Sequence, residues 1–325
     1  MKIHRLMMII GLICLAIVLI FNAHQFSNFI HLIKSLRWYI VVLIVVVQLI
    51  SYYLNALYYR SILRIFDHNI KLMRLFEGAL STNFVNYVTP TVGLAGAGFL
   101  SQVLSPEVPR GEGVLSQLVR YAFSSLAVLL MMPIGFGLIL LGNHSSQSVI
   151  KISVIASLVI IGLAMALIGL IHQELVLRRL AGRIEIKLLK IFTKLKKKSL
   201  GNFVDEFYIG YRLVVHQKRR MLAPFGWSII YIIVEILTLY MSFLAFGKAV
   251  NPGIAVMGYV LANIASVFGG TFFSTGVFEL GMLGTFVALG VPFALALSVI
   301  VVYRVLNLLI GLPPGFYYYR KYLPK

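Results

Sequence analysis

Three charged residues lie in apolar stretches of this 325-residue sequence, and their chemistry is the clearest pointer to a site. Glu235 lies near the middle of an apolar run over 221–246, Arg304 near the middle of a run over 291–312, and Glu279 between them. A charge at mid-depth in a bilayer costs about 2.5–3.5 kcal/mol on an insertion scale. Two readings follow, and they are compatible. Arg304 neutralises Glu279 or Glu235, or at least one of the three faces a cavity and meets a substrate headgroup or a proton.

Arg120 is a weaker candidate for the same site, because it lies close to one end of an apolar run over 118–141. A long basic side chain at such a position can extend to the membrane surface. Its neighbour Tyr121 and the polar segment that begins at Asn83 keep it among the candidates for substrate binding.

Two glycine-rich apolar segments, 83–98 and 268–284, interrupt the helical pattern. The first carries Asn83, Asn86 and Thr89, followed by a proline, which lacks a backbone donor, and by several glycines. Close helix packing would explain the glycines but not the asparagines. Non-helical backbone at membrane depth is tolerated only where protein or a wet cavity surrounds it. Interrupted segments in two halves of a chain therefore predict a substrate site at mid-membrane, with hydrogen bonds and half-helix dipoles around it.

The elements that must position these residues are membrane helices. The sequence is 60% hydrophobic and 12% charged, and several apolar runs reach roughly 20 residues. We expect an all-α, polytopic integral membrane protein with about six full transmembrane helices, in one domain over 1–325. The run over 6–21 has no cleavage site after it and predicts an uncleaved first helix. The only cysteine, Cys14, lies inside it, and we expect no metal and no cofactor.

Lysines and arginines predict the orientation, because cytoplasmic loops carry the positive excess. The main cluster, 178–220, lies between spans at about 149–171 and 221–246, so both spans meet the cytoplasm there. Basic residues also precede and follow the segment 75–104, which must then leave and return to the same side. Two full crossings need roughly 40 residues, so this segment predicts a re-entrant hairpin.

The second half repeats this arrangement with the opposite orientation. Its hairpin is predicted over 254–289 and enters from the outside. The halves are 1–171 and 221–325, separated by a basic cytoplasmic segment over 172–220. Both termini are expected in the cytoplasm and the protein in the cell membrane.

A basic amphipathic helix is predicted over 177–195, where leucines and isoleucines from Leu177 to Leu195 alternate with arginines and lysines at three- and four-residue steps. Such a helix binds the anionic inner leaflet. The formal charge of +19 is spread over membrane-flanking loops, and no nucleic-acid motif is present, so we expect no nucleic-acid partner.

Four short motifs in this order carry a family resemblance: 86–90 (NYVTP), 118–121 (LVRY), 276–279 (GVFE) and 303–306 (YRVL). The chain resembles the transmembrane (flippase) region of the lysylphosphatidylglycerol synthase family. It departs from that pattern at Phe268, where a proline is usual.

A second departure is Val119, where an acidic residue is usual. The resemblance implies movement of an aminoacylated anionic lipid to the outer leaflet, with a separate soluble domain making that lipid. The chain ends thirteen residues after Leu312, so we expect no such transferase domain here.

The sequence therefore favours a flippase-like translocase for an anionic or aminoacylated phospholipid or a polyprenyl-phosphate lipid. One alternative is a membrane component of phosphatidylglycerol lysyltransferase activity, linked to resistance against cationic peptides. A second is a non-transporting scaffold, and a third is an intramembrane hydrolase that uses Glu279. The chain has no His-Glu-x-x-His, nucleophile elbow or P-loop, which argues against enzymes of those kinds. Membrane phospholipids are the expected partners, and the sequence is compatible with a homo-oligomer.

Overall fold

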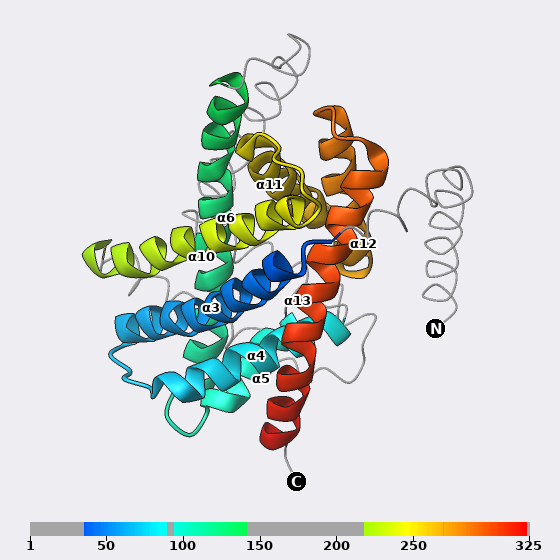
Figure 1. The fold of residues 1–325 in the computed structure, drawn as a ribbon. Helices are drawn as coiled ribbons and strands as arrows, with labels where there is room; N and C mark the ends of the chain where they lie inside the picture. The colour runs from blue at the N-terminus through cyan, green and yellow to red at the C-terminus, as the bar shows by residue number, and fades with distance from the viewer. Residues whose placement is uncertain (1–35, 90–93, 142–217, 269, 324–325) are drawn as a thin grey trace, which may run out of the picture.

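The computed structural model describes residues 36–89, 94–141, 218–268 and 270–323, and every regular element in these ranges is helical (Figure 1). The elements are α3 (Trp38–Leu63), the short 3-10 helix η1 (Arg64–Phe66), α4 (Leu72–Val88), α5 (Leu94–Leu104), α6 (Arg110–Leu141), α10 (Lys218–Ala245), α11 (Pro252–Phe268), α12 (Gly270–Ala288) and α13 (Phe293–Tyr322). The predicted spans over 6–21 and 149–171 and the basic helix over 177–195 lie outside the described residues.

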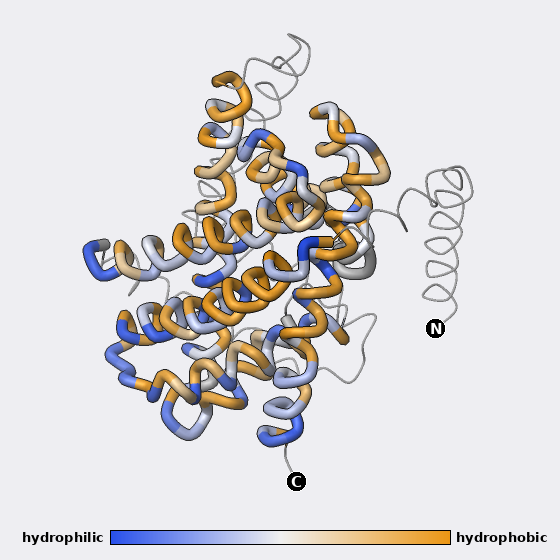
Figure 2. The backbone as a smooth tube through the Cα atoms, viewed as in Figure 1, coloured by the Kyte–Doolittle hydropathy of each residue, from blue (hydrophilic) through white to orange (hydrophobic). Residues whose placement is uncertain are grey.

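Four of the described helices, α3, α6, α10 and α13, are long and apolar enough to cross a membrane. Even α3, with 26 residues, is about 39 Å long at 1.5 Å per residue, which exceeds a hydrocarbon core of about 30 Å. Three of these helices correspond to the predicted spans over 118–141, 221–246 and 291–312. Hydrophilic residues gather at the loops and helix ends that flank the apolar runs (Figure 2).

Two helices extend beyond the predicted spans. Helix α6 begins at Arg110 rather than near Leu118, and α13 continues to Tyr322 rather than ending near Leu312. Pro313 and Pro314 lie inside α13 and remove two backbone donors. Prolines are tolerated in transmembrane helices because neighbouring groups satisfy the freed carbonyls.

The first predicted hairpin consists of α4 and α5, which pack against each other. Helix α5 has 11 residues and is about 17 Å long, too short to cross a bilayer. Helix α4 ends at Val88, and Thr89 has extended backbone (φ −109°, ψ 119°), as expected for a residue before proline. The chain therefore leaves the helix at the predicted tip.

The second hairpin consists of α11 and α12, and its backbone differs from the expectation. The glycine-rich stretch after Phe268 was expected to be non-helical, but α12 is helical from Gly270 to Ala288. A Cβ on Gly281 would lie 2.8 Å from the Cβ of Ala265 on α11, so this glycine permits close packing. The two hairpins lie at opposite ends of the described part in Figure 1.

Close backbone contacts hold α13 in the centre. A Cβ on Gly315 would lie 2.8 Å from the carbonyl oxygen of Leu80 and from the Cβ of Phe84, both on α4. Gly311, four residues earlier, faces the hydroxyl of Tyr52 on α3, which donates a hydrogen bond of 3.2 Å to the backbone of Asn307. These glycines form a small-x-x-x-small face, which membrane helices use to approach closely.

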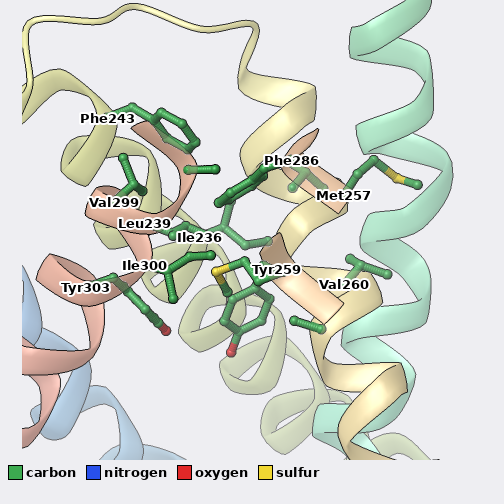
Figure 3. Packing of buried hydrophobic residues seen from close by; sticks show 14 of the residues in the cluster. Ile236, Leu239, Phe243, Met257, Tyr259, Val260, Phe286, Val299, Ile300 and Tyr303 are labelled. Atoms are coloured by element: carbon green, nitrogen blue, oxygen red, sulfur yellow. The ribbon is translucent and has the colours of Figure 1, made fainter. Parts of the chain in front are cut away.

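The largest apolar cluster joins α6, α10, α11, α12 and α13 (Figure 3). Phe243 and Phe286 meet edge to face, with ring centroids 5.0 Å apart. Figure 3 shows the hydroxyls of Tyr259 and Tyr303 pointing out of this cluster toward the same side. The Tyr303 hydroxyl there donates to the buried carboxylate of Glu235.

Candidate functional site

Arg304 on α13 pairs with Glu279 on α12. The Arg304 Nε lies 2.5 Å from Glu279 Oε1, and only 20% and 27% of the two side chains are exposed. The Arg304 guanidinium also lies over the ring of Phe278, 4.3 Å from its centroid. Of the two partners considered for Arg304, the structure selects Glu279 rather than Glu235. The pair joins the second hairpin to the last span.

Glu235 on α10 is held by neutral donors instead of a cation. Its Oε1 accepts hydrogen bonds from Ser51 Oγ (2.5 Å) and Gln48 Nε2 (3.4 Å), and its Oε2 accepts one from the Tyr303 hydroxyl (3.1 Å). The residue is 5% exposed. No Lys, Arg or His of the described ranges forms an ion pair with it.

The Glu235 donors on α3 were missed by the sequence analysis, although a signal was present. One face of this apolar helix carries a polar stripe, whose residues follow each other at steps of three, one and three positions: Gln48, Ser51, Tyr52 and Asn55. All four are buried. Both side-chain atoms of Asn55 lack a hydrogen-bond partner in the described part of the chain. This stripe marks the polar interior of the helix bundle.

Arg120 on α6 is buried between aromatic rings, so the expectation that it could extend to the membrane surface was wrong. It lies about 15 Å into α6, because the helix begins ten residues earlier at Arg110. Its guanidinium lies 5.5 Å from the Tyr59 centroid and 5.0 Å from the Tyr121 centroid. Its Nε donates to Gln117 Oε1 at 3.4 Å, and the residue is 7% exposed.

Arg120 differs from Arg304 in having no carboxylate partner among the described residues. Tyrosine rings offset part of the cost of burying the guanidinium through cation–π attraction, worth roughly 2 kcal/mol when desolvated. The positive charge is not cancelled by this contact.

The tip of the first hairpin touches both arginine environments. Asn86 Nδ2 donates to the Tyr121 hydroxyl at 3.2 Å, beside Arg120, and Asn86 Oδ1 lies against Gly96 on α5 without a hydrogen-bond partner. Tyr87, the next residue, lies within electrostatic range of Arg304. Two neighbouring residues of the tip, Asn86 and Tyr87, thus interact with the surroundings of different arginines.

Two other predicted residues have different roles in the structure. The Thr89 hydroxyl donates to the carbonyl of Val85 and thus closes the last turn of α4. Asn83 is half-buried on α4, and no hydrogen bond joins it to another described residue. The structure thus brings together Asn86, Arg120, Glu235, Glu279 and Arg304, but leaves Thr89 and Asn83 at the margin of this group.

A further buried carboxylate was missed. Glu77 on α4 is 7% exposed and accepts hydrogen bonds from Lys321 Nζ (2.7 Å) and the Tyr322 hydroxyl (2.6 Å) at the end of α13. The sequence did contain a signal for it, because an acidic residue is unusual in the apolar segment that begins the hairpin. These contacts join the base of the first hairpin to the last helix.

Comparison with protein families gives a match over nearly the whole chain. Residues 7–315 match the family described as the lysylphosphatidylglycerol synthase TM region. The chain belongs to this family. Together with its long apolar helices, membership in the lysylphosphatidylglycerol synthase TM family makes it a multi-pass membrane protein. No curated protein and no solved structure gives a significant match.

Proposed function

We propose that this protein moves a lipid with a phosphate-bearing headgroup across the membrane. The candidate substrates are an anionic or aminoacylated phospholipid and a polyprenyl-phosphate lipid. The carrying observation is Arg120, a buried guanidinium between Tyr59 and Tyr121 with no carboxylate partner in the described part of the chain. Family membership supports a role in lipid biology.

The chemistry of the site suits such a cargo. A phosphate in hydrocarbon is costly, and a planar guanidinium lowers that cost through short, charge-assisted hydrogen bonds. Tyrosine side chains present an apolar ring to lipid chains and a hydroxyl to the headgroup. Several of them surround the two arginines, including Tyr58, whose hydroxyl donates to the Arg120 carbonyl at 2.9 Å.

The Glu279–Arg304 pair is the proposed gate of the pathway. It joins α12 to α13 beside the tip of the first hairpin. In transporters built from two halves, access alternates when one part rocks against the other around a fixed site. A headgroup phosphate that attracts Arg304 would weaken its contact with Glu279 and favour that movement. We also propose that the predicted basic helix over 177–195 binds the anionic surface of the inner leaflet.

Reconstitution in liposomes tests the proposal. Purified protein is expected to speed the transbilayer movement of labelled phosphatidylglycerol over that of labelled phosphatidylcholine. Arg120→Gln is expected to remove most of this acceleration, since a neutral amide offers no charge to the phosphate. Lys248→Gln, which removes an exposed charge in the loop between α10 and α11, is the matched control.

Two outcomes would contradict the proposal. One is equal movement of the two lipids, and the other is an Arg120→Gln variant as fast as the parent. Either result would rule out a selective anionic-lipid site at Arg120, whereas no acceleration of either lipid would favour the scaffold role, which requires no transport.

A further inference from the structure

A basic cavity lies at one end of the α3–α10 pair, away from the buried charged residues described above. Its volume is about 440 Å³, and it lies between the last turn of α3, the 3-10 helix η1 and the first turns of α10. This size is within the roughly 300–1,000 Å³ that small-molecule sites occupy. The distribution of lysine and arginine predicts that this end faces the cytoplasm.

The charges that line this cavity are predominantly positive. Arg60, Arg64 and Arg220 contribute guanidinium groups, and Asp67 contributes the only carboxylate among the lining residues of the described chain. Arg220 Nη1 lies 2.8 Å from Asp67 Oδ1, but 56% and 77% of these side chains are exposed. An exposed pair of this kind is weak. The wall therefore favours an anion.

The side chain of Arg60 gives independent support for an anion site in this cavity. Its Nε is buried and has no hydrogen-bond partner in the described part of the chain. A buried donor without an acceptor is unfavourable, and because Arg60 lines the cavity, an oxygen bound there offers its guanidinium an acceptor. Arg64, one helical turn later, is exposed and lines the same cavity. Two guanidiniums at this spacing can bind the oxygens of one phosphate group.

Apolar and aromatic residues next to these charges favour a lipid over a soluble anion. Trp227 lines the cavity and packs against a buried cluster that includes Ile62 and Ile65. Tryptophan side chains prefer the level of the headgroups in a bilayer. Leu57, Ile65 and Ala223 also line the cavity and offer apolar surface for an acyl chain. Basic pockets between membrane helices bind anionic headgroups in this way.

We propose that this cavity binds the phosphate of an anionic phospholipid from the leaflet on its own side. The site goes beyond the proposed translocation, because it would hold a lipid at equilibrium whether or not the lipid crosses. It lies close to the central site: Tyr58, two residues before Arg60, donates a hydrogen bond to the backbone of Arg120. A lipid held here would lie next to the tyrosines that surround Arg120.

Tryptophan fluorescence can report on this cavity alone. The chain has two tryptophans, Trp38 and Trp227, so Trp227 is the sole reporter in a Trp38→Phe background. The full-length protein in phosphatidylcholine nanodiscs would be titrated with short-chain phosphatidylglycerol, short-chain phosphatidylcholine or inorganic phosphate. We expect a saturable change in emission with phosphatidylglycerol and none with the other two.

Variants separate the cavity from the rest of the protein. Arg60→Gln and Arg64→Gln are each expected to weaken phosphatidylglycerol binding about tenfold, the effect of losing one hydrogen bond to a charged group. Lys71→Gln removes an exposed charge near the same end and is expected to leave binding unchanged. Arg64 is exposed, so its variant should fold even if Arg60→Gln does not.

The outcomes distinguish the two proposals. Arg120→Gln is expected to keep the Trp227 response even where it loses transport. If Arg60→Gln and Arg64→Gln titrate like the parent, the cavity is not the binding site. If inorganic phosphate saturates the signal over the same concentration range as phosphatidylglycerol, the cavity takes a free anion and the lipid assignment is overturned.

Discussion

Arg120 and Arg304 have the same side chain, but their neighbours give them different chemistry. Arg304 shares its charge with Glu279, so it stabilises the contact of α12 with α13. Arg120 is surrounded by Tyr59, Tyr121 and Gln117, none of which is negatively charged. At the level of single residues, a carboxylate therefore neutralises Arg304, whereas no described residue neutralises Arg120.

Removing one member of the Glu279–Arg304 pair should destabilise the protein more than removing both. Glu279→Gln and Arg304→Gln each leave a buried charge without its partner, at a cost of roughly 3–5 kcal/mol. The double variant leaves no such charge and should be more stable than either single variant. Thermal unfolding of the three purified variants measures this. Losses that simply add in the double variant would contradict the pairing.

Glu235 should tolerate an amide but not an apolar side chain. Glu235→Gln keeps one oxygen that accepts hydrogen bonds from Ser51 and Gln48. The Tyr303 hydroxyl can rotate to accept a hydrogen bond from the new amide. We therefore expect the free energy of unfolding to fall by about 1 kcal/mol or less. Glu235→Leu leaves three buried donors without an acceptor, each costing about 1–3 kcal/mol. The comparison is made by thermal unfolding. Equal stability of both variants would show that these hydrogen bonds do not hold the helices.

At the scale of elements, α13 is the helix on which both hairpins converge. It contacts α12 through Arg304, α4 through Gly315, and the base of α4 again through Lys321. Lipid surrounds such a bundle with material as apolar as its own side chains, so close packing and polar contacts, rather than burial from water, hold the helices together. The fit between α13 and α4 is therefore a sensitive point.

Gly315→Ala should lower stability by roughly 1–2 kcal/mol. The added Cβ would press on the Leu80 carbonyl and the Phe84 Cβ, and backbone atoms cannot turn aside as a flexible side chain can. Gly284→Ala on α12 is the matched control, because nothing lies within 4 Å of its added Cβ, and it should be neutral or slightly stabilising. The Tm of each variant is the measurement. A Gly315→Ala protein as stable as the control would mean that α4 and α13 are not tightly packed.

The sequence could predict the helix pairs α4–α5 and α11–α12 and the Glu279–Arg304 contact because they carry strong local signals. Proline, glycine and charge are rare in apolar spans and costly when misplaced, so residues such as Glu279 and Arg304 are visible without a structure. The polar stripe that ends at Asn55 was missed, because uncharged polar side chains reduce the hydropathy of a span very little. The Glu77–Lys321 contact joins residues 244 positions apart, a pairing that only the fold can show.

At the scale of the whole molecule, the two hairpins lie at opposite ends of the described bundle, as Figure 1 shows. The first is joined to the end of α13, and the second packs against α6 and α13. The predicted inverted arrangement of the halves requires this separation. It also requires that the loop before α4 and the loop before α11 face different sides of the membrane.

Labelling of single cysteines from outside the cell tests this orientation. Both variants are made in a Cys14→Ser background. Ala249→Cys, in the loop before α11, is expected to react with an impermeant maleimide in intact cells. Asn69→Cys, in the loop before α4, is expected to react only after the cells are permeabilised. Both side chains are exposed, so accessibility depends on the side of the membrane rather than on burial. Asn251 is a poorer position, because its side chain bonds the Leu138 carbonyl and the Gly253 N–H.

Two positions chosen from the sequence alone extend the test: Ser145→Cys should be labelled from outside and Ser199→Cys should not. The positive charge around Asn69 and Ser199 is the reason for this expectation, since basic loops are retained in the cytoplasm. Labelling of either one in intact cells would reverse the orientation. The basic cavity at the end of α3 would then face the outer leaflet, and the lipid that it holds would come from there.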